Sequence, residues 1–386
     1  MTCRGGLRCR YSRWCAARST TWRRRVSETR CPRCMSRSDI VSTRYSTLHL
    51  QPSPAEWRDW RWQMRHALNG AAPELAAYGV DLAVAERVHR RYPVRLTPYA
   101  VSLLRRSEPS DPLALQALPA AAELVPEPEL TADPFFETTQ AACCYGLKQR
   151  FADRVLVMAH DQCAVACRHC TRKGLLGAAE VVRTPGQVAA AVAWVKAHPK
   201  VREVLLSGGE PLLLSDRKLL GLVRAFARLP QLDAVRIGTR VPVTLPMRVT
   251  PALARALGAS KKVWVNTQFN HARELTAESA EACGLLVDAG IPVSNQTVLL
   301  KGVNDSEEAL FALCTGLQRM RVRPYYVFLC DPIAGIAHFR VSLRRARSLE
   351  CALANRLGGL ALPRFVRDVP GAPRKLPIAV KRHATF

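Results

Sequence analysis

The amino-acid sequence predicts an α/β fold: an open, partial (β/α)6 barrel with a helical N-terminal region and a short C-terminal segment. From residue 154 onward, short apolar segments of strand type alternate with longer segments of helix type, and this unit occurs six times. Such a series forms a parallel sheet with helical crossovers. Polar and glycine-bearing residues follow directly after the strands. Because parallel barrels present their chemistry at the C-terminal ends of the strands, we expect the functional site at that rim.

The six units can be placed along the sequence by their apolar patterns and their start signals. Two helices begin with Thr-Pro, at Thr184 and Thr250, where threonine serves as the N-cap and proline occupies the first helical position. We expect strands over 154–160, 201–209, 234–240, 261–269, 292–300 and 324–330, and helices over 184–199, 216–229, 250–258, 275–290, 306–320 and 342–359.

The region before the barrel has a different texture. Residues 57–68 predict one amphipathic helix and residues 73–90 another, while residues 108–134 are rich in Pro, Ala, Glu and Leu and predict short helices with extended connectors. The predicted organisation is a basic tail over 1–45, an N-terminal helical wrapping region over 46–150, the barrel core over 151–345, and a C-terminal helix with a lysine-bearing segment over 346–386.

The first residues of the chain are strongly basic. The 386-residue chain has a net charge of +26, and residues 1–44 alone contain 12 Arg, no Lys and two acidic residues, together with five of the 14 cysteines. This stretch has no apolar period of 2 or 3.6 and so cannot bury a face, which predicts disorder over residues 1–45. An Arg-rich arm that binds nucleic acid is one alternative, and translation from upstream of the true start is another.

Composition also bears on the compartment. The sequence contains no run of 18 apolar residues, and no apolar stretch follows the N-terminal arginines. Neither a membrane span nor a secretory signal is therefore predicted. We expect a cytoplasmic protein, in which cysteines serve as metal ligands or remain thiols rather than forming disulfides.

Three cysteines follow the first predicted strand. The segment HDQCAVACRHCTRKG (160–174) spaces Cys163, Cys167 and Cys170 as C-x3-C-x2-C. Three thiolates on one loop can bind three irons of a [4Fe–4S] cluster and leave the fourth iron open to a small molecule. Zinc would need a fourth Cys or His ligand, and His169, lying between two ligands, is expected to point away.

The motif and its place resemble the signature of the radical S-adenosylmethionine (radical SAM) superfamily. That resemblance implies that SAM binds the open iron and that one electron from the cluster cleaves SAM to a 5′-deoxyadenosyl radical. It also implies an electron donor such as flavodoxin or ferredoxin. Further blocks, spread over residues 55–380, resemble the lysine 2,3-aminomutase family. They are CRHCTRK, SGGEPLLLSD, TRVPVTLPMRVTPAL, NTQFNHARELT, NQTVLLKGVND, RPYYVFLCDPIAGIAHFR and RDVPGAPRKLPI.

Residues for SAM follow from this resemblance. In SGGEP the glycines allow close approach of the backbone, and Glu210 offers an acceptor for the SAM amino group. Gln296 resembles a glutamine that contacts SAM. Gln268 stands where the family usually has His, and glutamine can still donate a hydrogen bond but cannot titrate. The residues implied for SAM are Ser207, Gly208, Gly209, Glu210, Gln268 and Gln296.

The resemblance also implies a site for pyridoxal 5′-phosphate (PLP) and an amino acid. Lys375 is the candidate Schiff-base lysine, although PGAPRK (370–375) replaces the usual PGGGGK and makes a stiffer loop. Arg150 and Arg154 suit the PLP phosphate, and Phe151 replaces a usual Tyr. The residues implied for the substrate are Arg172 at its carboxylate and Asp331 and Asp368 at the ε-ammonium of lysine.

Together these residues imply a PLP-dependent radical SAM aminomutase, an isomerase that moves the α-amino group of L-lysine to C3 and gives β-lysine. The same chemistry on glutamate or arginine, the modification of a translation-factor lysine, and a radical SAM enzyme without PLP remain open. A nucleic-acid-binding iron–sulfur or zinc protein is suggested by charge alone. The SGGEP block and the unbroken βα series argue against it, so neither nucleic acid nor membrane is expected as a partner.

Overall fold

The computed structural model describes residues 50–106, 108, 110–133, 135, 146–175 and 183–378. All of them belong to one of two compact units, the one that spans Leu50–Phe386. The predicted basic tail over residues 1–45 lies outside the described residues. None of the described helices is both long enough and apolar enough to cross a membrane.

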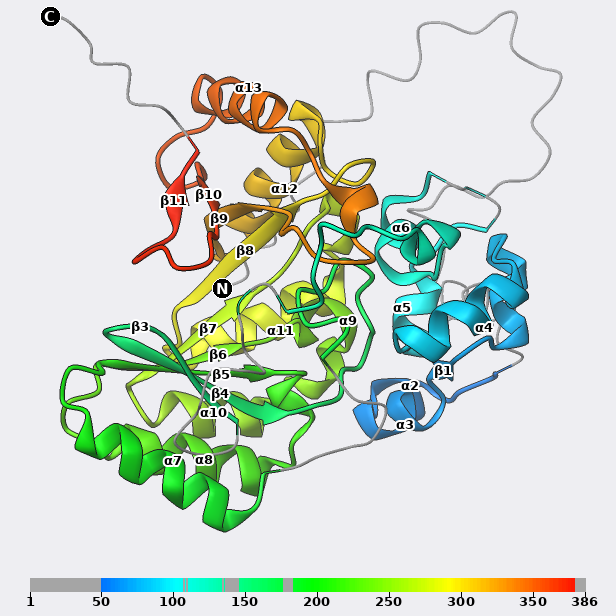
Figure 1. The fold of residues 1–386 in the computed structure, drawn as a ribbon. Helices are drawn as coiled ribbons and strands as arrows, with labels where there is room; N and C mark the ends of the chain where they lie inside the picture. Colours follow the sequence, from blue (N-terminus) through cyan, green and yellow to red (C-terminus); the bar gives the residue numbers. More distant parts are fainter. Residues whose placement is uncertain are drawn as a thin grey trace, which may run out of the picture. The chain divides into compact units, whose positions relative to one another are not determined.

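In the described part of the chain, one nine-stranded sheet organises the fold, in the order β11-β10-β9-β8-β7-β6-β5-β4-β3 (Figure 1). Strands β4 to β10 run parallel, while β3 pairs antiparallel with β4 and β11 with β10. The six predicted strands are β4 to β9, so the predicted open α/β barrel is confirmed. The strands are β3 (Leu147–Phe151), β4 (Arg154–His160), β5 (Glu203–Gly208), β6 (Ala234–Gly238), β7 (Val263–Thr267), β8 (Val293–Leu299), β9 (Arg323–Leu329), β10 (Arg364–Arg367) and β11 (Leu376–Pro377).

Helices connect the successive parallel strands. The two Thr-Pro starts behave as predicted, since the Thr184 hydroxyl accepts from the N–H of Gln187 and the Thr250 hydroxyl from the N–H of Leu253. The crossover helices are α7 (Pro185–Ala197), α8 (Asp216–Ala227), α10 (Pro251–Gly258), α11 (Ala277–Asp288), α12 (Glu307–Arg319) and α13 (Leu343–Ala354).

The core lies between the sheet and these helices. Alternate strand residues such as Val204 and Leu206 are fully buried against α7, α8, α10 and α11, where Phe226 also lies. A second apolar cluster joins α12 and α13 to β9 and β10 through residues such as Phe365. Because strand side chains alternate between faces, the residues between them, including Ser207, face the barrel interior and remain half-buried.

Short helical turns follow the C-terminal ends of four strands. They hold the polar side chains of the rim in place, because each turn fixes the backbone within a few residues of its strand. These turns are η3 (Pro211–Leu213), α9 (Val241–Thr244), η4 (Pro246–Arg248), η5 (Ala272–Glu274) and η6 (Ala337–Phe339).

The N-terminal region departs from two predictions. The single helix expected over 57–68 is two helices, because Asp59 ends the first and its carboxylate caps the second. The helix expected over 73–90 is likewise divided, since Gly79 at φ 77° ends one turn and Asp81 caps the next helix. The elements are α2 (Pro54–Arg58), α3 (Trp60–Arg65), β1 (Leu68–Asn69), η1 (Pro73–Tyr78), α4 (Leu82–Arg91), β2 (Arg95–Leu96), α5 (Pro98–Ser102), α6 (Pro112–Ala117) and η2 (Ala121–Leu124).

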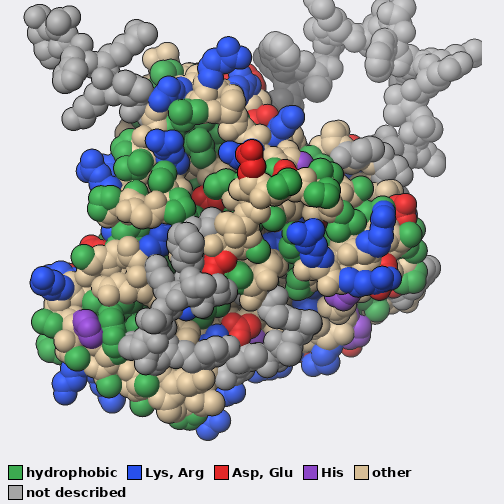
Figure 2. Space-filling view, in the orientation of Figure 1, with side chains coloured by type: hydrophobic (Ala, Val, Ile, Leu, Met, Phe, Trp, Pro, Cys, Tyr) green, Lys and Arg blue, Asp and Glu red, His purple; other side chains and the backbone are tan. Residues whose placement is uncertain are grey.

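Basic side chains are widely distributed over the surface. Figure 2 shows Lys and Arg scattered across the face in view, over the barrel helices as well as over the N-terminal elements. A nucleic-acid backbone is usually bound by a basic stripe or patch on one face. The described side chains on this face do not gather in that way.

Candidate active site

The three cysteines lie on the loop that follows β4, at the C-terminal end of the sheet. Main-chain hydrogen bonds attach this loop to the N-terminal region. The N–H of Ala166 donates to the carbonyl oxygen of Arg95 at 2.9 Å, and the N–H of Arg168 donates to that of Gln116 at 2.8 Å. The N-terminal region therefore fixes the path of the cysteine loop.

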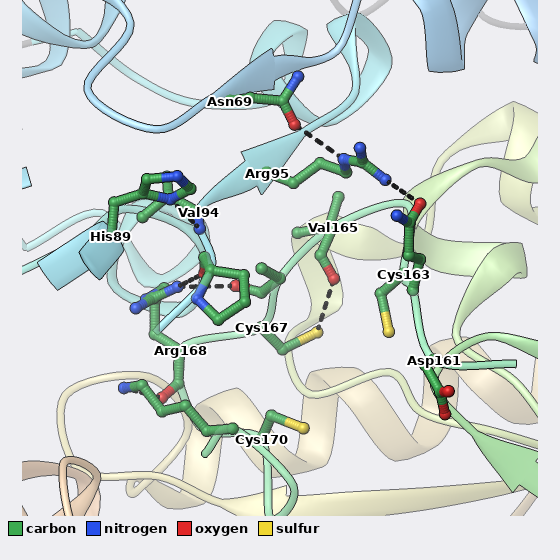
Figure 3. Close-up of a pocket in the computed structure, with 14 residues that line it drawn as sticks. Asn69, His89, Val94, Arg95, Asp161, Cys163, Val165, Cys167, Arg168 and Cys170 are labelled. Carbon is green, nitrogen blue, oxygen red and sulfur yellow. Dashed lines mark hydrogen bonds between the residues drawn. The ribbon is translucent and has the colours of Figure 1, made fainter. Parts of the chain in front are cut away.

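A cavity of about 300 Å³ opens beside the loop, and all three cysteines line it. Figure 3 shows their sulfur atoms facing a common space, with Asn69 and Arg95 on the opposite wall. Arg95 bridges the two walls, because its Nε donates to Oδ1 of Asn69 at 2.8 Å and its Nη1 to Oε1 of Gln162 at 2.9 Å. The cavity thus joins the cysteine loop to the strands β1 and β2.

The donor set suits a metal cluster. Burial raises the pKa of Cys163 well above its ordinary value, and the thiols of Cys170 and Cys167 raise it further. Such thiols become thiolates when a metal supplies compensating positive charge. Among the described residues, no three His, Cys, Asp or Glu side chains converge as the ligands of a single metal ion do. Three thiols on one loop that line the same cavity fit a [4Fe–4S] cluster held by three cysteines.

The SGGEP segment packs directly on the cysteine loop. A Cβ atom on Gly209 would lie 2.5 Å from the carbonyl oxygen of Gln162, and Gly208 has φ +102° with His160 against it. Only glycine fits such a close approach and such a backbone angle. The two glycines therefore bring the ends of β4 and β5 together beside the cysteines.

Glu210 is buried and already has hydrogen-bond partners. Its Oε1 accepts from the N–H of Leu212 at 3.0 Å and from the hydroxyl of Thr239 at 2.7 Å, and its Oε2 accepts from the N–H of Arg240 at 2.9 Å. Burial raises the pKa of Glu210 despite these bonds. The structure therefore gives Glu210 a part in joining β5 to β6, and contact with SAM remains a prediction for this residue.

Gln268 follows β7 and contacts the cysteine loop. Its Nε2 lies 3.1 Å from Nε2 of His169, and Nδ2 of Asn270 lies 3.2 Å from the same ring nitrogen. Both amides can donate to Nε2 only if this nitrogen carries no proton, which requires a neutral imidazole. Burial favours the neutral ring, because it lowers the pKa of His169 well below its ordinary value. The predicted orientation of His169 away from the cysteine sulfurs agrees with these contacts. Gln296, on β8, is half-buried and faces the barrel interior.

A second group of predicted residues meets at the far strands. Asp368 follows β10, and its Oδ1 accepts from Nη2 of Arg150 at 2.6 Å. Its Oδ2 accepts from Nη1 of Arg150 and from Nζ of Lys375, each at 3.0 Å. Lys375 reaches Asp368 because β10 and β11 form a hairpin that pairs Arg367 with Leu376. The structure thus brings Arg150, which is distant in the sequence, into one ion-pair group with Asp368 and Lys375.

Aromatic rings enclose this group. The Lys375 ammonium lies 4.9 Å from the ring centre of Phe328 and 5.6 Å from that of Phe151. The guanidinium of Arg154 also lies over Phe151, at 4.6 Å. Burial lowers the pKa of Lys375, although Asp368 acts in the opposite direction. A shielded amine flanked by two arginines fits an aldehyde cofactor with a phosphate, as PLP is.

Asp331 and Arg172 complete the predicted substrate residues. Asp331 follows β9, and burial raises its pKa to about 7, with Asp368 adding to the rise. Arg172 is half-buried on the cysteine loop, where its N–H donates to the sulfur of Cys170 at 3.3 Å. Since β4, β9 and β10 are parallel, these residues lie at the same rim of the sheet.

Sequence reasoning missed several buried charged residues near the cysteines. Arg240 was part of the TRVPVTLPMRVTPAL block but received no role, and its Nη1 donates to the sulfur of Cys167 at 2.8 Å. Glu123 lies in a stretch that predicted short helices with extended connectors, and it is fully buried and forms ion pairs with Arg168 and Lys173. The one available signal was the occurrence of Glu123 between apolar residues, which is unusual for an exposed connector.

A parallel α/β sheet with a C-x3-C-x2-C loop after its first parallel strand defines a radical SAM enzyme. The sequence pattern described as the Radical SAM superfamily matches residues 158–314, which contain this loop. Among solved structures, Streptococcus suis SuiB bound to S-adenosylmethionine aligns with a TM-score of 0.44 at 15% identity, over 56% of this chain and 50% of that chain.

Similarity to relatives extends well beyond the cysteine loop. L-lysine 2,3-aminomutase of Clostridium subterminale is 39% identical over 344 residues, which are 88% of this chain and 82% of the relative. Glutamate 2,3-aminomutase of Clostridioides difficile is 30% identical over 336 residues, which are 85% and 78%. The chain belongs to the lysine 2,3-aminomutase family of radical SAM enzymes. Its cofactors are therefore a [4Fe–4S] cluster, S-adenosylmethionine and PLP, and the predicted family, isomerase class and cofactors are confirmed.

Proposed function

We propose that the protein is an L-lysine 2,3-aminomutase that moves the α-amino group of L-lysine to C3 and gives β-lysine. The observation that carries the substrate is the pair of carboxylates at the ends of neighbouring strands, Asp331 after β9 and Asp368 after β10. The register pairs Phe328 with Val366, so both carboxylates follow this last pair within about three residues, at the same rim of the sheet. Asp368 adds to the raised pKa of Asp331, and it also accepts a hydrogen bond from Nζ of Lys375.

When bound, the cluster and SAM supply a radical that takes a hydrogen atom from C3, and PLP supplies the ring that supports nitrogen migration. The chain itself binds and orients these groups. We assign Cys163, Cys167 and Cys170 to the cluster. The groups assigned to SAM are the SGGEP segment (Ser207, Gly208, Gly209 and Glu210) with Gln268 and Gln296, and those assigned to PLP are Lys375, Arg150 and Arg154.

The substrate is held at both ends. Arg172 is assigned to the α-carboxylate, because its guanidinium can donate two parallel hydrogen bonds to a carboxylate. Asp331 and Asp368 are assigned to the ε-ammonium. In the structure Asp368 already holds the Lys375 ammonium at 3.0 Å, so it binds a primary amine of the same kind as the one at the end of lysine. With PLP held by Lys375, that position on Asp368 would be available to the substrate.

Electrostatics favour lysine over glutamate at this position. Two unit charges about 4 Å apart interact by on the order of 4 kcal/mol at an effective dielectric of about 20. Half of that energy already exceeds the ~1.4 kcal/mol that corresponds to a tenfold preference. A glutamate side chain would bring a third negative charge to the two carboxylates. Arginine is compatible with both carboxylates, so the length of the pocket decides between arginine and lysine.

The redox partner and the organisation of the chain are part of the same proposal. We infer a one-electron donor of the flavodoxin or ferredoxin type, because the cluster must be reduced before SAM is cleaved. We also propose the cytoplasm as the compartment, since such donors and reduced thiols occur there. The organisation proposed is a wrapping region over 46–150, a barrel over 151–345 and a PLP-lysine segment over 346–386, after a dispensable tail over 1–45.

The test is a comparison of substrates in reconstituted protein. Turnover of lysine, arginine and glutamate is measured anaerobically, with SAM, PLP and a strong reductant, in the wild type and in Asp331→Asn and Asp368→Asn. We expect lysine to be preferred, and each variant to raise the KM for lysine at least tenfold. Asp233→Asn is the matched control, because Asp233 forms an exposed ion pair with Arg202. A wild type that prefers glutamate, or variants that turn over lysine as the wild type does, would contradict the assignment.

A further inference from the structure

The guanidinium of Arg240 lies against one of the three cysteine sulfurs. Arg240 follows β6 at the rim of the sheet and precedes α9. Its Nη1 donates a hydrogen bond to Sγ of Cys167 at 2.8 Å. A charged donor on a sulfur is a stronger and more polarising contact than a neutral N–H. By comparison, Cys170 accepts from the main-chain N–H of Arg172 at 3.3 Å.

The remaining donors of Arg240 are fixed by three other groups. Its Nη2 donates to Oε1 of Glu274 at 2.7 Å and to Oε1 of Gln116 at 2.8 Å, and its Nε donates to the carbonyl oxygen of Gln268 at 3.2 Å. Glu274 is itself buried and accepts from the N–H of Asn270 at 2.5 Å. With each side of the guanidinium bound, it cannot turn away from Cys167.

The surroundings keep Arg240 charged. An arginine guanidinium is protonated throughout the ordinary pH range, and the carboxylate of Glu274 balances its charge at this position. The Glu274 carboxylate lies at Nη2, whereas the Cys167 sulfur is bound by the other terminal nitrogen, Nη1. A positive group is therefore held beside Cys167 in a largely buried position.

We propose that Arg240 sets the reduction potential of the iron–sulfur cluster by donating this hydrogen bond to the Cys167 ligand. The inference rests on the proposed function, because it takes Cys167 as a cluster ligand. Reduction transfers one electron from a low-potential donor protein to the cluster, with no bond formed or broken in this chain. The cluster becomes more negative by one charge, and a fixed guanidinium stabilises the more negative form. Hydrogen bonds to the sulfurs and the local charge are the protein's means of tuning such potentials.

The first experiment is a redox titration of reconstituted Arg240→Gln without SAM, followed by the EPR signal of the reduced cluster. We expect the ratio of reduced to oxidised cluster at a given potential to fall at least tenfold, which corresponds to 59 mV for a one-electron couple. Arg240→Lys, which keeps the charge, should recover part of the loss. Arg248→Gln is the matched control. Arg248 is also a largely enclosed arginine, buried even more deeply than Arg240, but it donates to the carbonyl oxygens of Leu212 and Leu214 rather than to a cysteine.

A second measurement uses the wild-type chain, so it does not depend on the folding of a variant. Protein labelled with ¹⁵N in its arginine side chains is reduced, and pulsed EPR is used to detect coupling between the cluster electron spin and ¹⁵N. The hydrogen bond predicts a coupling that persists in Arg248→Gln. A wild-type cluster without such a coupling, or an Arg240→Gln cluster with an unchanged potential, would overturn the proposal.

These measurements test the role of Arg240 independently of the proposed lysine aminomutase activity. If lysine is not turned over but the potential shifts as expected, the proposed substrate is wrong and the role of Arg240 stands. If lysine is turned over and neither the potential nor the coupling depends on Arg240, the aminomutase stands and this inference fails.

Discussion

Lys375 and Asp368 are joined by a hydrogen bond of 3.0 Å between Nζ and Oδ2, and Arg150 donates to the same carboxylate from the opposite edge of the sheet. Asp368 thus holds two cations before any cofactor or substrate is bound. Because burial lowers the pKa of Lys375, the amine loses its proton more readily than an exposed lysine does. A neutral amine is the form that reacts with an aldehyde, so this arrangement prepares Lys375 for PLP.

The first prediction concerns that lysine. Borohydride reduction of PLP-loaded protein should leave a pyridoxyl group on Lys375, detected by peptide mapping. Lys375→Ala should lose the label and lysine turnover while keeping the iron–sulfur spectrum. Lys301→Ala should keep both, because Lys301 is exposed. A label on another lysine would show that Lys375, in the altered PGAPRK loop, does not bind PLP.

The second prediction concerns the cysteine loop. Anaerobic reconstitution should load about four irons per chain, with the absorbance shoulder typical of the cluster. Alanine at Cys163, Cys167 or Cys170 should remove the spectrum, because a cubane held by only two thiolates is not retained. Cys351→Ala is the control, since Cys351 is exposed on α13. Full iron content in a triple alanine variant would be incompatible with this ligand set.

The third prediction concerns Glu123, which joins the N-terminal region to the cysteine loop. It forms ion pairs with Arg168, at 2.5 Å, and with Lys173, and all three side chains are almost fully buried. Lys173 also donates to the carbonyl oxygen of Gly335, after β9, at 2.9 Å. Glu123→Ala would leave two buried cations without a carboxylate. We expect the free energy of unfolding to fall by about 3–5 kcal/mol.

Denaturant unfolding checks this value, with Glu86→Ala as the control. Glu86 pairs with Arg90 on the exposed face of α4, where such pairs contribute about 0.3–0.5 kcal/mol. The pH dependence has a defined sign. Arg168 and Lys173 outweigh the effect of burial and lower the pKa of Glu123, so its stabilisation is present above the ordinary carboxyl range and is lost as pH falls through the lowered pKa. If Glu123→Ala and Glu86→Ala lost the same free energy of unfolding, the ion pairs of Glu123 would not stabilise the fold more than an exposed pair does.

The barrel was predictable from the sequence, because its signals are local. Apolar runs, together with Thr-Pro starts at two of the helices, located β4 to β9 and the crossover helices within a few residues. The short edge strands were not predicted. Strand β10 has four residues and β11 has two, so neither is long enough to show a period. The divided N-terminal helices depended on single residues, Asp59 and Gly79, that stop a helix without changing its apolar pattern.

The candidate site was likewise predictable from the sequence only where its signals are local. The C-x3-C-x2-C spacing located the cysteine loop, since ligands on one loop need no tertiary information. The ion pairs of Asp368 were not predictable, because they join residues 218 and 7 positions away in the sequence. Its partners in the structure are Arg150 and Lys375. Sequence identifies which residues carry charge, and strand order decides which of them meet.

The last prediction concerns Asp331 and the pH dependence of lysine binding. Burial, together with the nearby Asp368, raises the pKa of Asp331 from 3.8 to about 7, although Arg150 and Lys375 act in the opposite direction. Near pH 6 the carboxyl group of the free enzyme is therefore mostly protonated. An ε-ammonium beside it favours the ionised form, so lysine binding should release a proton from Asp331. The affinity for lysine should then rise with pH, by at most about tenfold per pH unit, up to about pH 7. Above that pH it should level off.

The same shift has a consequence for the free enzyme. Because the pKa is higher in the folded state, the folded protein retains a proton that the unfolded chain loses above pH 3.8, and the associated stability is lost as pH rises through about 7. Both effects are measured by lysine binding and thermal unfolding between pH 5 and 8. Asp331→Asn should flatten both profiles, because asparagine does not titrate, whereas the exposed control Asp233→Asn should leave them unchanged. If the Asp331→Asn profile follows the wild type, another group controls lysine binding, and Asp331 does not bind the ε-ammonium.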